Sequence, residues 1–272
     1  MNNREIKRRI ASVKETVKIT RAMYSISVAK MMRAQTELPT AERFYEASKS
    51  LLNGISSASS DFFRDRGRRA AFIVIGGDKG LCGDYNQTLF ESAYAALNER
   101  EERYLFIVGS VAKEMLSKAG IQADVEFLHS AENPSPEASY SMAADLINLY
   151  RDDLLDEIFL IYSVKEGDHG VVKKEKLLPF AGEKPALPLE GVSDGAVERA
   201  VYEYLAAAMY HALISSSLAE HFARVIAMPQ ATENGEKMIS ELTSEYNKAR
   251  QEGITRALAD VGSFENEYGE SV

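Results

Sequence analysis

The sequence has one cysteine, Cys82, no tryptophan, and no apolar run approaching the roughly 18 residues that a membrane span needs. A single cysteine excludes an internal disulfide and fits a reducing compartment, although a bridge to another chain stays open. The amino terminus lacks the apolar segment of a secretory signal, so we expect none. With 45% hydrophobic residues among 272, the chain can still form a sizeable core.

Positive charge is scarce overall but concentrated at the amino terminus. The net charge is -9, yet residues 1–33 hold nine Lys or Arg and two Glu, a balance of +7 that leaves -16 for the remainder. Such a segment suits nucleic acid, an anionic membrane, a targeting peptide or an acidic protein partner, and a solvated helix face explains it equally well. A targeting peptide is disfavoured because the helical pattern continues past thirty residues.

The first sixty residues predict a coiled-coil helix, with neither Gly nor Pro before Pro39. Apolar or small side chains recur as a stripe at alternating steps of four and three residues. These steps average 3.5 residues per turn, the period of a coiled-coil seam. Pro39 is expected as a kink or as the first residue of a new helical turn. The stripe consists of Ile6, Ile10, Val13, Val17, Thr20, Tyr24, Ser27, Met31, Ala34 and Leu38.

Residues 194–262 predict a second long helix, with a kink or break at Pro229 and an acidic tail over 263–272. At 1.5 Å per residue such a helix reaches roughly 100 Å, which no single compact domain can bury. We therefore expect the two helices to pair as an antiparallel coiled coil. Its stripe is Val197, Val201, Leu205, Ala208, Ala212, Ser215, Ala219, Phe222, Ile226, Ile239, Leu242, Tyr246 and Ala249.

The middle of the chain, residues 68–190, alternates strand-like and helix-like segments. This order predicts a doubly wound, Rossmann-like α/β domain inserted between the paired helices. The expected strands are "AAFIVIG", "YLFIVG", "ADVEFL", "EIFLIYS" and "VVKKEKLLPF", and the expected helices are "NQTLFESAYAALNE", "SVAKEMLSKAG" and "SPEASYSMAADLINLY".

The loop "GGDKGLCGDYN", residues 76–86, follows the first strand, where nucleotide-binding enzymes keep a phosphate loop. Its glycine spacing fits neither G-x-G-x-x-G nor the P-loop. Asp78 and Asp84 also disfavour an anion, and Lys79 alone opposes them. The structural interpretation is a tight turn with positive φ at its glycines, in which Leu81 and Cys82 fill a contact.

The other residues that could bind a metal or act as a nucleophile lack the spacing or the companion motifs of such sites. The histidines, His129, His169, His211 and His221, lack a metal-binding spacing, and "SVAK" at Ser110 and Ser27 to Lys30 match S-x-x-K without companion motifs. Cys82 could be a reactive thiol, but a small apolar role is favoured. We therefore expect no catalytic residue, no metal site and no cofactor.

Three segments resemble the gamma chain of F-type rotary ATP synthases. They are "EIKRRIASVKETVKITRAM" (5–23), "DKGLCGDYN" (78–86) and "ARVIAMPQATENGEKMISELTSEYNKARQEGITRAL" (223–258), about a quarter of the chain. The resemblance implies a non-catalytic rotor shaft that couples proton or sodium flow to ATP chemistry in the head. The implied partners are the alpha and beta chains, the epsilon chain and the membrane c-ring, with no nucleic acid and no membrane span, at the cytoplasmic face of the bacterial membrane.

The resemblance also implies contacts to partner subunits. Arg250, Gln251 and Thr255 match residues that engage a loop of the beta chain, and Met23 faces the same loops. The other implied contacts form the loop Lys79, Gly80, Leu81, Cys82 and Gly83.

The sequence departs from the family pattern at Pro229, at Asp84 where glycine is usual, and at Arg256 and Ala257, and it ends in an acidic stretch. Two other functions therefore stay open. One is a divergent paralogue that acts as a non-rotary coiled-coil adaptor, and the other is an α/β nucleotide-binding enzyme with helical dimerisation arms.

Overall fold

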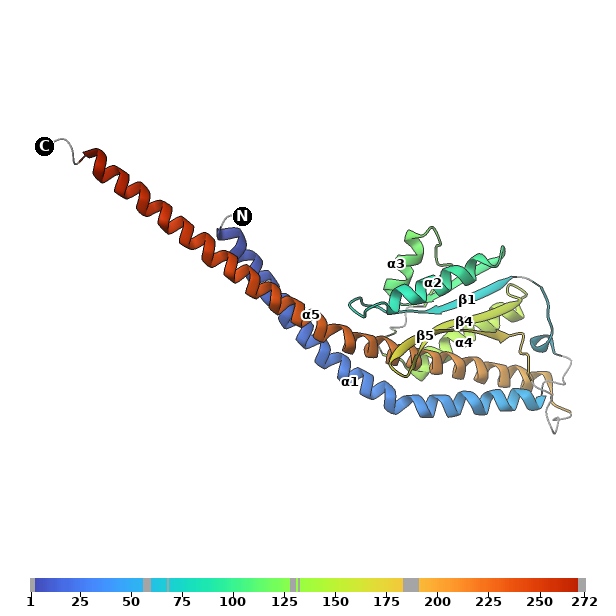
Figure 1. The fold of residues 1–272 in the computed structure, drawn as a ribbon. Helices are drawn as coiled ribbons and strands as arrows, with labels where there is room; N and C mark the ends of the chain where they lie inside the picture. The colour runs from blue at the N-terminus through green and yellow to red at the C-terminus, as the bar shows by residue number, and fades with distance from the viewer. Residues whose placement is uncertain are drawn as a thin grey trace. The chain divides into compact units, whose positions relative to one another are not determined.

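The computed structural model describes residues 3–55, 60–67, 69–127, 131, 133–182 and 191–268, with side chains up to residue 255. Two compact units are described separately: the coil unit, Met1–Ser25 with Ala227–Val272, and the domain unit, Ile26–Ile226. Figure 1 shows the elements. The helices are α1 (Asn3–Ile55), a 3-10 turn (Asp61–Phe63), α2 (Tyr85–Asn98), α3 (Ser110–Lys118), α4 (Pro136–Arg151) and α5 (Asp194–Tyr268), and the strands are β1 (Ala70–Ile75), β2 (Arg103–Val108), β3 (Val125–Glu126), β4 (Glu157–Glu166) and β5 (His169–Leu178).

The expected pairing of the two long helices is confirmed. In the coil unit, the hydroxyls of Thr20 and Thr232 are 2.7 Å apart, and Arg21 forms an ion pair with Glu236. In the domain unit, one buried cluster joins α1 to α5 through Ala34, Ala41, Ile214 and Leu218. The small alanines let the two helix backbones approach closely.

The heptad stripes predict the buried faces of α1 and α5 correctly except at two residues, which are exposed. Ile6, Val17 and Thr20 are buried as expected, but Tyr24 is 40% exposed. On α5, Ile226 is 54% exposed, whereas Arg224 and Met228 are buried. The buried face of α5 thus passes through a charged residue that a hydrophobic stripe leaves out.

Of the kink or break expected at Pro229, the break is wrong, because α5 is helical throughout, and α1 likewise continues through Pro39; the kink stays a prediction. A proline inside a helix costs about 3 kcal/mol through its missing amide and its ring. Both prolines lie on exposed positions, so their rings face solvent, while the neighbouring Met228 is buried. Packing of the flanking turns outweighs the local loss. The helical backbone also extends into the expected acidic tail as far as Tyr268.

The inserted domain contains a mixed five-stranded sheet in the order β3-β2-β1-β4-β5. The first four of these strands pair in parallel, as expected for a doubly wound domain, and β5 pairs antiparallel to β4. The antiparallel edge follows from the connection, since only two residues separate Glu166 from His169 and a parallel crossover needs a dozen or more.

Both faces of the central strand are covered. All six residues of β1 are buried, and successive side chains of a strand point to opposite faces. Ala70, Phe72 and Val74 pack in a cluster with α2 and α3, while Ala71, Ile73 and Ile75 belong to a cluster with α4 and α5. Figure 1 shows α2 and α3 on the side of the sheet away from α5.

The segment of α5 that crosses the domain is buried almost all round. Residues 204–209 and 212–221 are all buried, and they are rich in alanine and serine. Their small side chains let the helix fit between the sheet and α1, and the Ser216 hydroxyl accepts a hydrogen bond from the Ser163 amide at 3.2 Å. Among the described residues, no helix is both long and apolar enough to cross a membrane.

Gly235 provides a test of the helix packing in the coil unit. A Cβ atom at this position would lie 2.5 Å from the Val17 Cγ2 atom. We expect Gly235→Leu to lower the free energy of unfolding by about 1–3 kcal/mol, because the stiff valine cannot move aside. Urea titration followed by circular dichroism measures the change. Gly253→Leu is the matched control, since nothing lies within 4 Å of a Cβ there, and it should stabilise by up to about 0.8 kcal/mol.

Candidate functional site

The loop between β1 and α2 is tied to the neighbouring strand and helix at its first residues. The Gly76 amide donates to the Val108 carbonyl at 2.9 Å, and the Gly77 carbonyl accepts from the Val111 amide at 3.1 Å. Gly76 is required by packing, because a Cβ there would lie 2.4 Å from the Ala112 Cβ. The backbone of the loop therefore packs closely against α3 where it leaves the sheet.

Asp78 uses its carboxylate inside the protein. One oxygen accepts from the Ser110 amide at 3.2 Å and the other from the Ala131 amide at 3.1 Å. The Ser110 hydroxyl donates in turn to the Asp78 carbonyl at 3.0 Å. The amide at the start of α3, which could bind a phosphate, is thus bonded to a side chain of the loop. This geometry argues against a nucleotide at this edge of the sheet.

The turn itself presents Leu81 to solvent. Leu81 and Gly83 have positive φ values of 62° and 59°. The left-handed backbone expected at the glycines of this turn is therefore found at one of them, Gly83, and also at Leu81. Leu81 is 58% exposed and Cys82 is 1% exposed. The expectation that both residues fill a contact is therefore right for Cys82 and wrong for Leu81.

Cys82 is a packed residue. Its sulfur accepts from the Asn86 side-chain amide at 3.1 Å, and the residue clusters with Tyr85 and Ala219. Burial raises the pKa of the Cys82 thiol. A buried thiol with a raised pKa holds little thiolate at neutral pH, so the geometry favours the apolar role.

A buried ionic cluster on α5 holds the turn, and the sequence analysis missed it. The Arg224 guanidinium donates to the Glu220 carboxylate at 2.6 Å, to the Gly80 carbonyl at 3.1 Å and to the Lys79 carbonyl at 3.3 Å. It also contacts His221 Nδ1 at 3.2 Å. The signal in the sequence was a Glu and an Arg four residues apart on a buried helix face.

The remaining candidates do not assemble into a reactive group. His211 stacks on Tyr45 with ring centroids 5.4 Å apart, and burial lowers the pKa of its imidazole. Ser110 bonds to the Asp78 backbone while Lys113 pairs with Glu126, so this serine and lysine serve separate contacts. His129 lies outside the described residues. Across the described ranges, no three His, Cys, Asp or Glu residues are grouped to hold a metal ion.

The expected partner-contact residues of the coil unit lie on exposed or half-exposed helix surface. Arg250, Gln251 and Thr255 are exposed on α5, and the Thr255 hydroxyl donates to the Gln251 carbonyl at 3.0 Å. Met23 on α1 is partly buried. Arg250 thus offers its planar, permanently charged fork to the surroundings.

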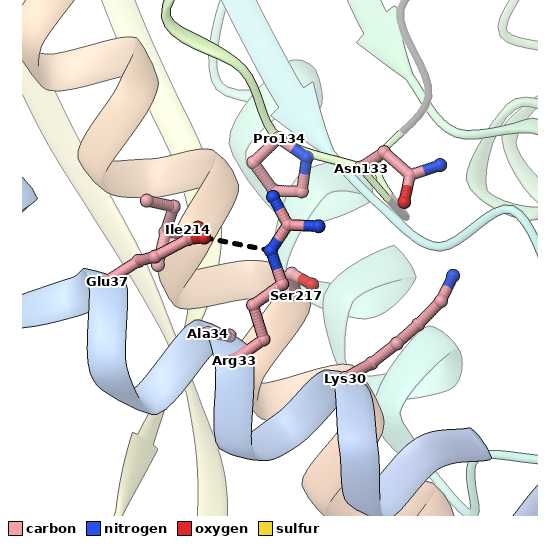
Figure 2. A pocket seen from close by; sticks show the side chains of 8 residues that line it. All are labelled: Lys30, Arg33, Ala34, Glu37, Asn133, Pro134, Ile214 and Ser217. Atoms are coloured by element: carbon pink, nitrogen blue, oxygen red, sulfur yellow. Dashed lines mark hydrogen bonds and ion pairs between the residues drawn. The ribbon is translucent and has the colours of Figure 1, made fainter.

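A small cavity of about 80 Å³ lies in the domain unit between α1, α5 and the segment before α4. Figure 2 shows Lys30 and Arg33 leaving α1 on the side of Asn133 and Pro134. The Arg33 Nε donates to the Glu37 carboxylate at 2.8 Å, so its charge is partly balanced within the cavity wall. At about 80 Å³ the cavity is much smaller than the roughly 300–1,000 Å³ of typical ligand pockets.

Together these features define a class of protein. Two long paired helices carry an inserted α/β domain, and Asp78, Glu220 and Arg224 at the domain's loop edge serve structural contacts. Such a molecule is suited to mechanical or scaffolding work within an assembly.

Comparison with known proteins identifies the family. The family model for ATP synthase matches residues 2–263. The chain is 31% identical to the ATP synthase gamma chain of Caldanaerobacter subterraneus subsp. tengcongensis, covering 96% of this chain and 98% of the relative. It is 32% identical to the ATP synthase gamma chain of Alkaliphilus metalliredigens, with 95% and 96% covered. The chain therefore belongs to the ATP synthase gamma-chain family.

Solved structures have the same fold. A chain of the Euglena gracilis mitochondrial ATP synthase, solved with OSCP, F1 and c-ring, matches with a TM-score of 0.74 at 17% identity, over 99% of this chain and 96% of that one. A chain of the Tetrahymena thermophila central stalk and c-ring matches with a TM-score of 0.56 at 23% identity, over 79% and 99%. This protein is therefore a gamma subunit of an F-type ATP synthase, a non-catalytic subunit of that complex.

Asp78 and Asp84 allow a matched test of the loop. Asn at position 78 has one acceptor oxygen and would turn its amide group toward a backbone N–H. We expect Asp78→Asn to lower the free energy of unfolding by about 1–2 kcal/mol, as measured by urea titration. Asp84→Asn should change it by less than about 0.5 kcal/mol, because Asp84 is exposed and makes no capping hydrogen bond. Equal effects of the two changes would contradict the role given to Asp78.

Proposed function

We propose that this chain is a working rotor shaft: its coiled coil turns inside a ring of alpha and beta chains and couples ion flow through the membrane c-ring to ATP chemistry in the head. The observation that carries the proposal is the length of the paired helices, 53 residues in α1 and 75 in α5, which far exceeds what the inserted domain can cover. This uncovered part also exposes the large apolar side chains of Ile19, Met238 and Ile254, which favours a surrounding partner.

The mechanism is reciprocal coupling through a stiff element. A shaft with different side chains on its different faces favours a different state in each beta chain, and nucleotide binding in those chains acts back on the shaft. The basic first helical segment complements acidic surfaces of the head, where charge sets register more than affinity. Epsilon and the c-ring contact the inserted domain, and the protein sits peripherally at the cytoplasmic face of the bacterial membrane.

The exposed residues of α5 are the proposed contact to a beta-chain loop. Arg250 supplies a forked donor set to a carboxylate, and Gln251 and Thr255 add neutral hydrogen bonds along neighbouring turns. Met23 contributes an adaptable apolar contact to the same region. In the domain unit, the loop from Lys79 to Gly83 is a second contact to a partner.

Reconstitution tests the function. Mixed with cognate alpha and beta chains, this protein should assemble into a complex whose ATP turnover depends on it, while the chain alone should hydrolyse no ATP. The measurements are size-exclusion chromatography and phosphate release. A stable complex without chain-dependent turnover would favour the adaptor, and turnover by the isolated chain that survives further purification would favour an enzyme.

The contact residues are tested by a double change. Arg250→Ala with Gln251→Ala should lower head assembly or turnover, because each charge-assisted hydrogen bond is worth roughly 1.5–3 kcal/mol when desolvated. The helix should persist, since alanine is the better helix former. The matched control removes a cation and an amide elsewhere on the exposed surface of α5, by Lys237→Ala with Asn234→Ala. If both variants behave like the parent, the proposed contact is wrong.

A further inference from the structure

Arg224 is an unusual residue to find inside α5. Its side chain is 3% exposed and that of Glu220 is 1% exposed, so both charges are removed from water. Burying an ion pair is favourable only when further hydrogen bonds satisfy the remaining donors and acceptors. The remaining donors of Arg224 are directed to the carbonyls of Lys79 and Gly80, in a different part of the chain.

The turn that receives these bonds has few side-chain contacts at its glycines. A Cβ atom at Gly80 or Gly83 would meet nothing within 4 Å, and Leu81 is 58% exposed. The turn is therefore held on α5 by the hydrogen bonds to its backbone carbonyls together with the packing of Cys82 against Ala219. The Asn86 side-chain amide donates to the Lys79 carbonyl at 3.3 Å, but Asn86 lies in α2 and does not tie the turn to α5.

The geometry of Arg224 suits this task. A guanidinium presents several N–H donors in one plane, so it reaches a carboxylate, two carbonyls and the His221 Nδ1 atom together. Since arginine can only donate, Nδ1 of His221 accepts, and the imidazole is neutral. A lysine ammonium is a point charge and cannot satisfy acceptors spread this widely.

We infer that Arg224 is the positioning residue that latches the turn Lys79–Leu81 onto α5 and thereby holds Leu81 outward in its left-handed conformation. Because these hydrogen bonds fix the turn to α5, the turn and its exposed Leu81 side chain move together with that helix. The value of this arrangement for a partner contact rests on the proposed function, but the latch itself is a property of the chain alone.

Cys82 provides a direct readout. It is the single cysteine of the chain, it follows the latched turn, and it is 1% exposed, so a thiol reagent reaches it only when the turn opens. We therefore expect the native, full-length chain to react slowly with a maleimide. Arg224→Lys should accelerate the labelling about tenfold, because some of the charged hydrogen bonds are lost while Glu220 keeps a cationic partner.

A second variant separates the latch from general stability. Glu220→Leu with Arg224→Met removes both buried charges at similar volume, a change that is often neutral or stabilising for the fold. The urea midpoint should stay near that of the parent or rise, while Cys82 labelling becomes roughly 100-fold faster. The matched control is Glu233→Leu with Lys237→Met, another pair four residues apart on α5 whose side chains are both 65% exposed, and it should leave labelling unchanged.

The outcomes decide the inference. Faster labelling at an unchanged urea midpoint supports the latch. Labelling at the parent's rate overturns it, and so does an acceleration that merely follows a fall in the urea midpoint. If the double variant does not fold, Arg224→Lys is judged by the same criteria.

The partner contact is tested separately in the reconstituted complex. Leu81→Asn removes the apolar side chain while tolerating the left-handed backbone. A loss of turnover with unchanged Cys82 labelling supports the contact of the turn. If turnover is unchanged while the Arg224 variants still accelerate labelling, the contact assigned to this loop is wrong and the latch stands.

Discussion

The packing of α1 against α5 is the constraint on which the rest of this structure depends. In the coil unit the helices approach closely enough for Gly235 to leave no room for a Cβ beside Val17. In the domain unit, α1 again packs on α5 through Ala34 and Ala41. Neither helix can bury its stripe alone, because an isolated two-helix seam depends on its partner for every apolar contact.

The inserted domain is built onto α5 as much as onto its own sheet. The run of alanine and serine in α5 lets the sheet approach the helix, and the Arg224 cluster ties the loop after β1 to the same helix. A stiff helix joined to a domain at several points carries force without a flexible linker. In the proposed shaft, mechanical coupling therefore depends on buried polar contacts as well as on the hydrophobic seam.

Periodicity predicted the helices, the strands and the pairing, because heptads and buried strand runs reflect burial that is repeated along the chain. It could not predict the continuity of α5 through Pro229, since tertiary packing of the flanking turns outweighs the local cost. It also missed Arg224, because a hydrophobic stripe assigns charged residues to solvent. Leu81 was placed in a contact because its exposure depends on a left-handed backbone that leucine rarely adopts.

Rotation of the inserted domain with the paired helices is the most direct test of a working shaft. A complex of this chain with its alpha and beta chains would be fixed to a surface, with a visible probe attached to the inserted domain through Lys118→Cys, an exposed position that reacts while Cys82 stays buried. Adding ATP should turn the probe continuously in one direction, and the turning should stop when ATP is exhausted. ATP hydrolysis with a stationary probe would contradict a rotating shaft.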